Sequence, residues 1–85
     1  MKILVVYSTT EGHTRKVAGF ISGILQNAGH EVTIADATND PPLPGGYDAI
    51  LMGASIHVHK YQSALADYIT RHVTILNKMP GAFFS

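Results

Sequence analysis

The sequence predicts one α/β domain, in which a doubly wound parallel β-sheet carries helices on its faces. Two observations predict this fold. Apolar runs that suit buried strands alternate with segments of helical periodicity, and a strand, a helix and a second strand follow one another within the first 36 of 85 residues, which is the length of a βαβ unit. A chain of this length has room for a single domain, residues 1–85.

The first half of the chain contains the strand–helix–strand unit. Residues 2–7 form a continuous apolar run, which predicts a strand covered on both faces. Residues 14–28 carry apolar side chains at steps of three and four, which predicts a helix with one face on the core. The side chains expected on this face are Val17, Phe20, Ile21, Ile24, Leu25 and Ala28. Gly29 is expected to end the helix, and residues 31–36 to form the second strand.

The second half begins with a connection that cannot be a regular helix. Residues 37–46 contain Pro41, Pro42 and Pro44, which predict an extended loop. Residues 49–54 are a third apolar strand, and residues 62–76 predict a second helix. The apolar face of that helix is expected to consist of Leu65, Tyr68, Ile69, Val73 and Leu76. Residues 81–85 begin like a fourth buried strand.

Composition excludes several classes of function. Apolar residues make up 46% of the chain and the formal net charge is zero, which argues against general binding of nucleic acid or of anionic membranes. No apolar run approaches the roughly 20 residues that span a bilayer, and no secretory leader is recognisable, so we expect a cytoplasmic protein. The absence of cysteine excludes disulfides, thiolate metal sites and cysteine catalysis.

The segment from Ser8 to Thr14 joins the first strand to the first helix and is expected to bind an anion. Backbone N–H groups and the positive end of the helix dipole both point at such a loop. Its serine and threonine hydroxyls are neutral donors that suit a phosphate monoester. Thr10 or Thr14 could instead merely cap the helix. The nucleoside triphosphate motif G-x-x-x-x-G-K-[ST] and the dinucleotide motif G-x-G-x-x-G are both absent.

The phosphate loop and its flanks resemble the flavodoxin family. The likeness rests on Val5-Val6-Tyr7, Thr9, Thr10, Gly12, Thr14, Ala18 and Ile21. It implies a sheet in the order 2-1-3-4 that stops within strand four, and a bound flavin mononucleotide (FMN) whose phosphate is surrounded by Thr9, Thr10, Gly12, His13 and Thr14. Glu11 departs from the family's hydroxyl residue, and we expect it to turn its carboxylate outward and offer only its backbone N–H. The flavin would perform the electron chemistry, so no catalytic side chain is expected.

The resemblance also implies a second flavin loop after the third strand. The residues expected to line the ribityl chain and one ring face are Ala54, Ser55, Ile56, His57, Val58 and Tyr61. His57 stands where electron-transfer flavodoxins commonly stack an aromatic side chain. With His59 it could be read as a metal site, but two histidines without a carboxylate or thiolate are an incomplete ligand set, and no metal is expected. Ser55 lies in no nucleophile elbow, which argues against acyl transfer.

The chain is also similar to the bacterial menaquinone-dependent protoporphyrinogen IX dehydrogenases, which are flavodoxin-fold enzymes of haem biosynthesis. This likeness rests on Gly53-Ala54-Ser55-Ile56, Tyr61, Ser63 and residues 76–85. It implies an FMN-dependent oxidoreductase acting on a small-molecule redox substrate. Two alternatives stay open, a flavodoxin-type electron carrier with a redox partner protein and a non-catalytic truncated module. Whether the chain is an enzyme by itself is therefore left open.

The sequence supplies three strands and the beginning of a fourth, whereas the flavodoxin sheet has five. The third flavin-contacting loop, which follows strand four, lies beyond Ser85. We therefore expect either a fragment that binds FMN weakly or a homodimer in which a second copy completes the sheet. Any contact with a quinone or a membrane surface is expected in the other half of the fold.

Overall fold

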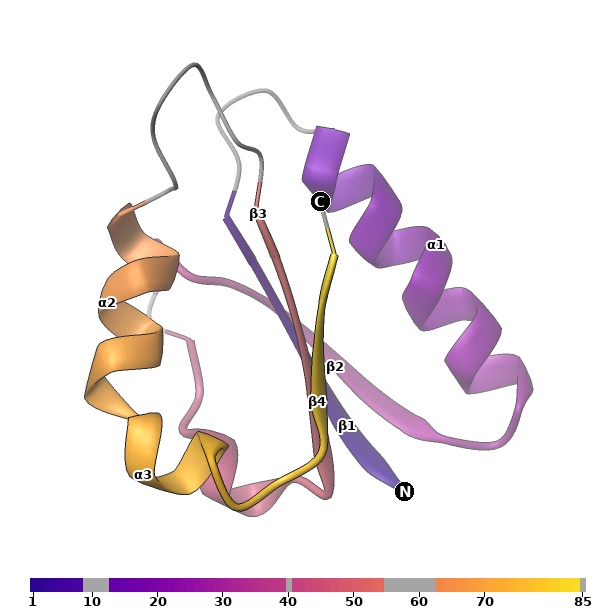
Figure 1. The fold of residues 1–85 in the computed structure, drawn as a ribbon. Helices are drawn as coiled ribbons and strands as arrows, with labels where there is room; N and C mark the ends of the chain where they lie inside the picture. The colour runs from indigo at the N-terminus through magenta and orange to yellow at the C-terminus, as the bar shows by residue number, and fades with distance from the viewer. Residues whose placement is uncertain (9–12, 40, 55–62, 85) are drawn as a thin grey trace.

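The computed structural model of the chain describes residues 1–8, 13–39, 41–54 and 63–84, and for residues 13, 14, 54, 63, 64, 83 and 84 it describes the backbone alone. Four parallel strands form one sheet in the order β2-β1-β3-β4 (Figure 1). Their bounds are Lys2–Ser8 for β1, Glu31–Asp36 for β2, Ala49–Ala54 for β3 and Gly81–Phe84 for β4. The predicted α/β class and strand order are both confirmed.

The sheet lies between two layers of helix. Helix α1, residues His13–Asn27, covers one face, while α2, residues Ser63–Arg71, and α3, residues Val73–Leu76, cover the other (Figure 1). Each strand runs in the same direction because the intervening segment crosses back along a face of the sheet. None of the helices in the described ranges is long and apolar enough to cross a bilayer.

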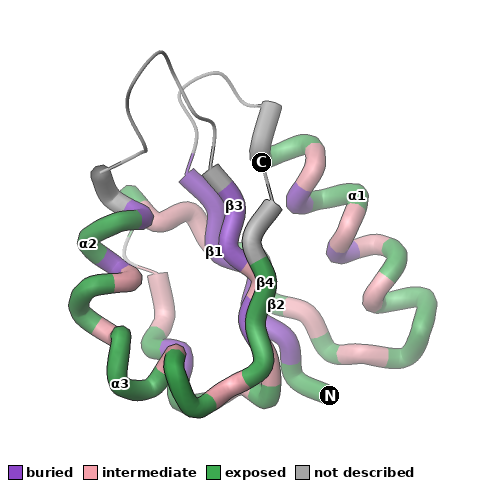
Figure 2. Tube along the Cα trace, viewed as in Figure 1, coloured by how far each residue is buried: buried purple, intermediate pink, exposed green. Residues whose placement is uncertain are grey.

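Strand β1 is the centre of the core. Six of its seven residues are buried, from Ile3 to Ser8 (Figure 2). Leu4 and Val6 pack in one core cluster with Leu65 and Tyr68 of α2, and Ile3, Val5 and Tyr7 pack in the other with Ala18 of α1. This alternation follows from the two-residue repeat of a strand, and it confirms the prediction that the first strand is covered on both faces.

Helix α1 buries a narrower face than its apolar pattern predicts. Ala18 and Ser22 are buried, whereas Phe20 is 72% exposed and Ile24 is 55% exposed. Phe20 lies two residues from Ala18, which on a helix of 3.6 residues per turn is about 200° around the axis, and Ile24 stands in the same relation to Ser22. The prediction that Phe20, Ile24 and Ala28 face the core is therefore wrong, since all three are exposed. Gly29 ends the helix as expected, with a φ of 94° that glycine adopts without strain.

The second predicted helix is divided into two. Helix α2 ends at Arg71, and α3 begins at Val73 after His72, whose φ of −116° and ψ of 19° are not helical. Residues around the break have branched β-carbons, which lowers their helix propensity, and the Thr70 hydroxyl bonds back to the carbonyl of Ala66 at 2.9 Å, a contact that bends helices. Leu65 and Tyr68 are buried as predicted, but Val73 is 46% exposed, which corrects its assignment to the core.

The edges of the fold differ in part from the sequence prediction. Strand β4 lies at one edge of the described sheet, and Gly81 and Ala82 are exposed, so the prediction that this part of the strand is buried is wrong. The proline-rich connection is only partly extended: residues 37–39 form a turn after β2, and Leu43 and Tyr47 are extended on either side of a short 3₁₀ turn, η1, at Pro44–Gly46. Pro44 is buried and anchors that turn.

Candidate functional site

The carboxyl ends of β1 and β3 meet at one edge of the sheet. Ser8, the last residue of β1, pairs in register with Ala54, the last residue of β3. Helix α1 begins at His13 and α2 at Ser63, and the first turns of both helices lie toward this same edge (Figure 1). Both predicted flavin loops therefore leave from adjacent points. In open α/β sheets, ligands bind in this position.

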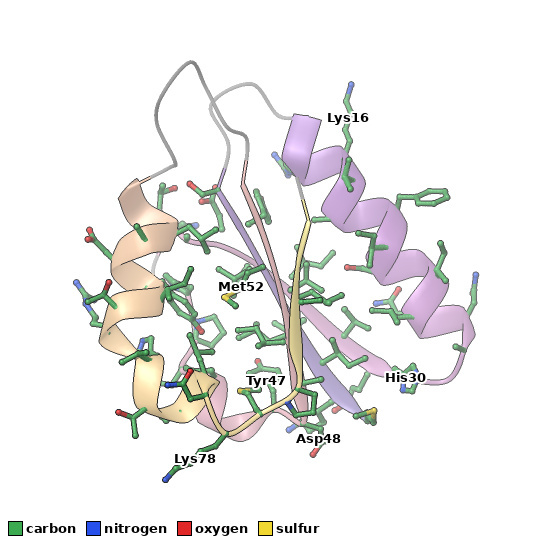
Figure 3. All side chains as sticks on the ribbon, viewed as in Figure 1. Lys16, His30, Tyr47, Asp48, Met52 and Lys78 are labelled. Carbon is green, nitrogen blue, oxygen red and sulfur yellow. The ribbon has the colours of Figure 1, made fainter. Side chains whose placement is uncertain are left out.

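The start of α1 is electrostatically suited to an anion. The first turn of the helix contains no acidic residue. It contains Arg15 and Lys16, both exposed, and Lys16 projects into solvent near the helix start (Figure 3). Basic side chains here do not compensate the helix dipole, so the positive potential of the dipole and that of the two side chains add. The negative charge of a bound phosphate would offset the positive potential of the helix dipole and that of the two side chains.

The structure describes only part of the predicted contact set. His13 and Thr14 are the first two residues of α1, and Ala54 ends β3. Thr14 lies inside the helix rather than before it, which disfavours the alternative that it is a simple N-cap. The predicted contacts that lie outside the described residues are Thr9, Thr10, Glu11, Gly12, Ser55, Ile56, His57, Val58 and Tyr61. Their contacts with phosphate and ring stay predictions.

The sequence places Ser8 in the phosphate loop, whereas the structure makes it the last residue of β1. Its side chain is fully buried at the end of β1, and its Oγ has no hydrogen-bond partner among the residues that the structure describes. Buried hydroxyls without partners are uncommon in folded proteins.

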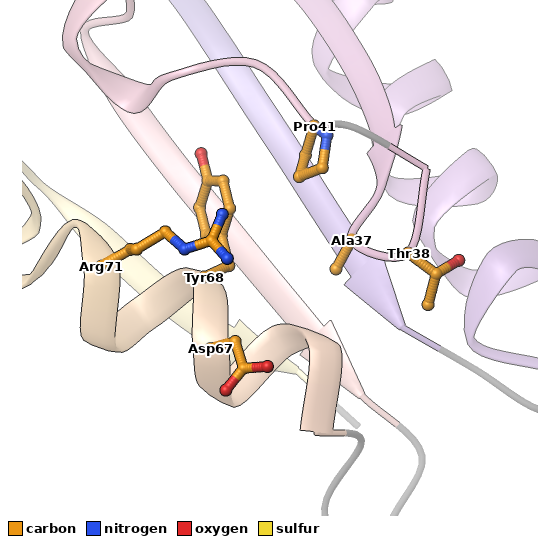
Figure 4. A pocket seen from close by; sticks show the side chains of 6 residues that line it. All are labelled: Ala37, Thr38, Pro41, Asp67, Tyr68 and Arg71. Atoms are coloured by element: carbon orange, nitrogen blue, oxygen red, sulfur yellow. The ribbon is translucent and has the colours of Figure 1, made fainter.

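A second polar region lies beside β2. The Asp36 Oδ1 atom accepts hydrogen bonds from the backbone N–H of Thr38 at 2.9 Å and from its hydroxyl at 2.7 Å, so this carboxylate stabilises the turn after the strand. Between this turn and α2 lies an open hollow of about 350 Å³ (Figure 4). It is lined by Ala37, Thr38, Pro41, Asp67, Tyr68 and Arg71.

The histidines with described side chains make structural contacts. The ring of His72 meets the ring of Tyr68 edge-on, with 4.7 Å between the centroids. His30 Nδ1 lies 3.4 Å from the N-terminal nitrogen, and His30 is at the far end of α1 from Lys16 (Figure 3). Within the described ranges, no three side chains of histidine, aspartate or glutamate come together as a metal site would require.

The fold and the position of this edge define a flavodoxin-type domain. Residues 4–85 match the flavodoxin domain family over nearly the whole chain. The chain therefore belongs to the flavodoxin domain family.

Known relatives agree with this membership. The chain is 36% identical over 86 aligned residues to protoporphyrinogen IX dehydrogenase (quinone) of Escherichia coli, an alignment that covers 100% of this chain and 48% of the relative. The chain thus spans about half the length of that curated relative. Among solved structures, oxidised flavodoxin 1 of Bacillus cereus superposes with a TM-score of 0.82 at 19% identity, covering 99% of this chain and 60% of the other. The flavodoxin of Fusobacterium nucleatum bound to flavin mononucleotide superposes with a TM-score of 0.68 at 11% identity, covering 98% of this chain and 68% of the other.

Proposed function

We propose that this chain binds FMN at the shared edge of β1 and β3 and belongs to an oxidoreductase. The observation that carries the proposal is the start of α1 at His13, five residues after β1 ends at Ser8 and beside the end of β3. This geometry directs helix amides toward a short connection that is rich in hydroxyl groups. An anion held there needs no metal ion to neutralise it.

The residues of the chain fit such a group. Arg15 and Lys16 add positive potential at the helix start, and Thr9, Thr10 and Thr14 supply neutral donors for a phosphate monoester. When bound, the flavin supplies the electron chemistry, and the protein holds its phosphate, orients its ring and limits access of water.

Titration of FMN into the protein, followed by quenching of flavin fluorescence, tests the binding proposal. Thr14→Ala should weaken the affinity by about 5- to 150-fold, because it removes one donor to a charged acceptor. Thr70→Ala is the matched control, since Thr70 is an exposed threonine of α2 whose hydroxyl bonds within its own helix. Absence of binding by the unaltered protein, or equal affinities for the two variants, would count against the phosphate site.

We propose that the substrate is a porphyrinogen and that a quinone accepts the electrons removed from it. The support is the 36% identity with the Escherichia coli dehydrogenase along the full chain, against 19% with the flavodoxin of Bacillus cereus. The net charge of zero also fits an enzyme better than an electron carrier, because flavodoxin carriers tend to be strongly acidic. Anaerobic mixing of the FMN-loaded protein with protoporphyrinogen and a soluble quinone, followed by porphyrin fluorescence, tests this step.

The second candidate is an electron carrier of the flavodoxin type. The superposition on flavodoxin structures, with a TM-score of 0.82, is the observation in its favour. A carrier would exchange electrons with a redox protein and would leave protoporphyrinogen unchanged in the mixing experiment. Quinone-dependent appearance of porphyrin fluorescence would exclude a role limited to electron carriage.

A further inference from the structure

Helix α1 carries two large apolar side chains on the side that faces away from the sheet. Ala18 and Ser22 are buried against the sheet, whereas Phe20 is 72% exposed and Ile24 is 55% exposed. Phe20 and Ile24 are four residues apart, so they lie next to each other on the helix surface. At 3.6 residues per turn, the remaining residues of this outer face are Lys16, Gly23 and Asn27. Adjacent large apolar side chains in water indicate an interaction surface.

The charges of α1 are unbalanced along its length. The first turn contains no acidic residue but carries Arg15 and Lys16, and Lys16 projects into solvent (Figure 3). The last turn contains no basic residue. Positive potential therefore accumulates at the start of the helix and negative potential at its carboxyl end, and side chains of α1 offset neither. A second α1 that lies antiparallel to the first would place the positive end of each helix beside the negative end of the other.

The outer face of α1 is complementary to itself in this antiparallel arrangement. A two-fold axis at the height of residue 22 sets residue 20 of one copy opposite residue 24 of the other, and the reverse pair follows by symmetry. Phe20 of each copy then packs on Ile24 of the second copy. A Cβ built on Gly23 has no neighbour within 4 Å, so open space lies beside these contacts and the two helices can approach closely. Lys16 lies beside the carboxyl end of the second helix.

We propose that this chain forms a two-fold symmetric dimer through the outer face of α1, with a second copy of the chain as the partner. The surface is distinct from the edge strand β4 and does not depend on a bound flavin. Two helices of 15 residues bury less than the roughly 800 Å² per partner of a standard stable interface. The dimer is therefore weak, and it forms at high protein concentration.

Sedimentation equilibrium over a series of protein concentrations tests the dimer. The mass should rise from that of the 9.1 kDa chain towards twice this value. Phe20→Glu should raise the dissociation constant by at least about tenfold, because it places a carboxylate against Ile24 of the second copy. Leu43→Glu is the matched control, since Leu43 is 69% exposed but lies outside α1. This control should associate as the unaltered protein does.

Cross-linking tests the antiparallel orientation. The sequence contains no cysteine, so an introduced thiol reacts at one known position. The proposed pair brings residue 16 beside residue 27 of the second copy, whereas the two copies of residue 16 stand about 18 Å apart along the helix axes. A short bifunctional maleimide should link a mixture of Lys16→Cys and Asn27→Cys into a dimer and should link Lys16→Cys alone poorly. Efficient linkage of Lys16→Cys to itself would overturn the antiparallel arrangement.

Three further outcomes would overturn the dimer. The first is a monomeric mass of the unaltered protein at every concentration. The second is a dimer that Phe20→Glu leaves intact, since another surface, such as the edge of β4, would then form it. The third is a lower thermal midpoint of Phe20→Glu in dilute, monomeric solution, because Phe20 would then be covered within its own chain. None of these outcomes bears on the proposed FMN site, which the flavin titration tests separately.

Discussion

The hydroxyl of Tyr68 donates a 2.8 Å hydrogen bond to the backbone carbonyl of Pro42. The two residues are 26 positions apart, and the bond ties the proline-rich connection after β2 to helix α2. Tyr68 also belongs to the core cluster around Leu4 and Val6, and its ring lines one wall of the hollow beside α2 (Figure 4). One side chain thus joins the sheet, the helix and a loop that has few regular hydrogen bonds of its own.

Replacing Tyr68 by phenylalanine should lower the free energy of unfolding by about 1 kcal/mol. The variant keeps the buried ring but leaves the Pro42 carbonyl without its donor. For a domain of this size, the thermal midpoint should fall by roughly 4–8 °C. Thr70→Val, which removes an exposed hydroxyl from the same helix, is the control and should change the midpoint much less. Equal midpoints for Tyr68→Phe and the unaltered protein would show that the bond contributes nothing.

The same hydroxyl makes stability depend on pH in the alkaline range. Burial raises the pKa of Tyr68 to about 12, with a smaller contribution from Tyr47, against 10.0 in an exposed tyrosine. Because the folded state holds the proton more tightly than the unfolded state, the stabilisation is complete below pH 10 and is lost as the pH rises to about 12. Urea denaturation between pH 9 and 12 measures this slope. Tyr68→Phe should be less sensitive to pH there, and identical slopes for the two proteins would contradict the assignment to Tyr68.

Two glycines provide a test in which one substitution has opposite effects. Gly29 has a φ of 94°, which alanine adopts only with strain, so Gly29→Ala should destabilise the protein by about 1 kcal/mol. Gly19 is exposed within α1, and an added Cβ would have no neighbour within 4 Å. Gly19→Ala should therefore stabilise the protein by about 0.5–1 kcal/mol through helix propensity. Denaturant midpoints report both changes, and a shift of the same sign for the two variants would refute this account.

The strands of the sheet and most of the helices could be predicted because they depend on local pattern, whereas the strand order was implied by the resemblance to flavodoxins. The apolar run of β1, the glycine after α1 and the loop motif each act within a few residues. The exposure of Phe20 depends instead on the width of the α1 face that contacts the sheet, and the apolar periodicity of the helix does not predict that width. The break at His72 coincides with weak helix formers and with the hydrogen bond from the Thr70 hydroxyl to the carbonyl of Ala66, and no single residue predicts it.

Ser8 shows the same limit within the site. Its burial depends on the elements that cover the end of β1, and whether its hydroxyl has a partner depends on the positions of distant groups. The residue type alone does not distinguish a paired from an unpaired serine. Conversely, the position of a helix start directly after β1 was predictable, since it depends on local pattern, and the binding of an anion there stays a prediction.

The last prediction concerns the affinity of a polypeptide of residues 1–85 for FMN. Flavin binding in this family uses the phosphate loop and two loops that enclose the ring, and one of those two follows β4, beyond residue 85. A monomer of this length would therefore leave one ring face in water. The loss of stacking and apolar burial on that face is on the order of 2–4 kcal/mol, which corresponds to roughly 30- to 1,000-fold in affinity.

Titration of FMN into the flavin-free polypeptide, with the molecular mass measured in parallel by light scattering, tests this expectation. A monomer should bind weakly and lose flavin on gel filtration. Tighter binding that appears together with a doubled mass would mean that a second copy supplies the missing wall, as the exposed part of the edge strand β4 would allow. Tight, stoichiometric binding by a proven monomer would refute the prediction, because the loops after β1 and β3 would then be sufficient to hold the flavin.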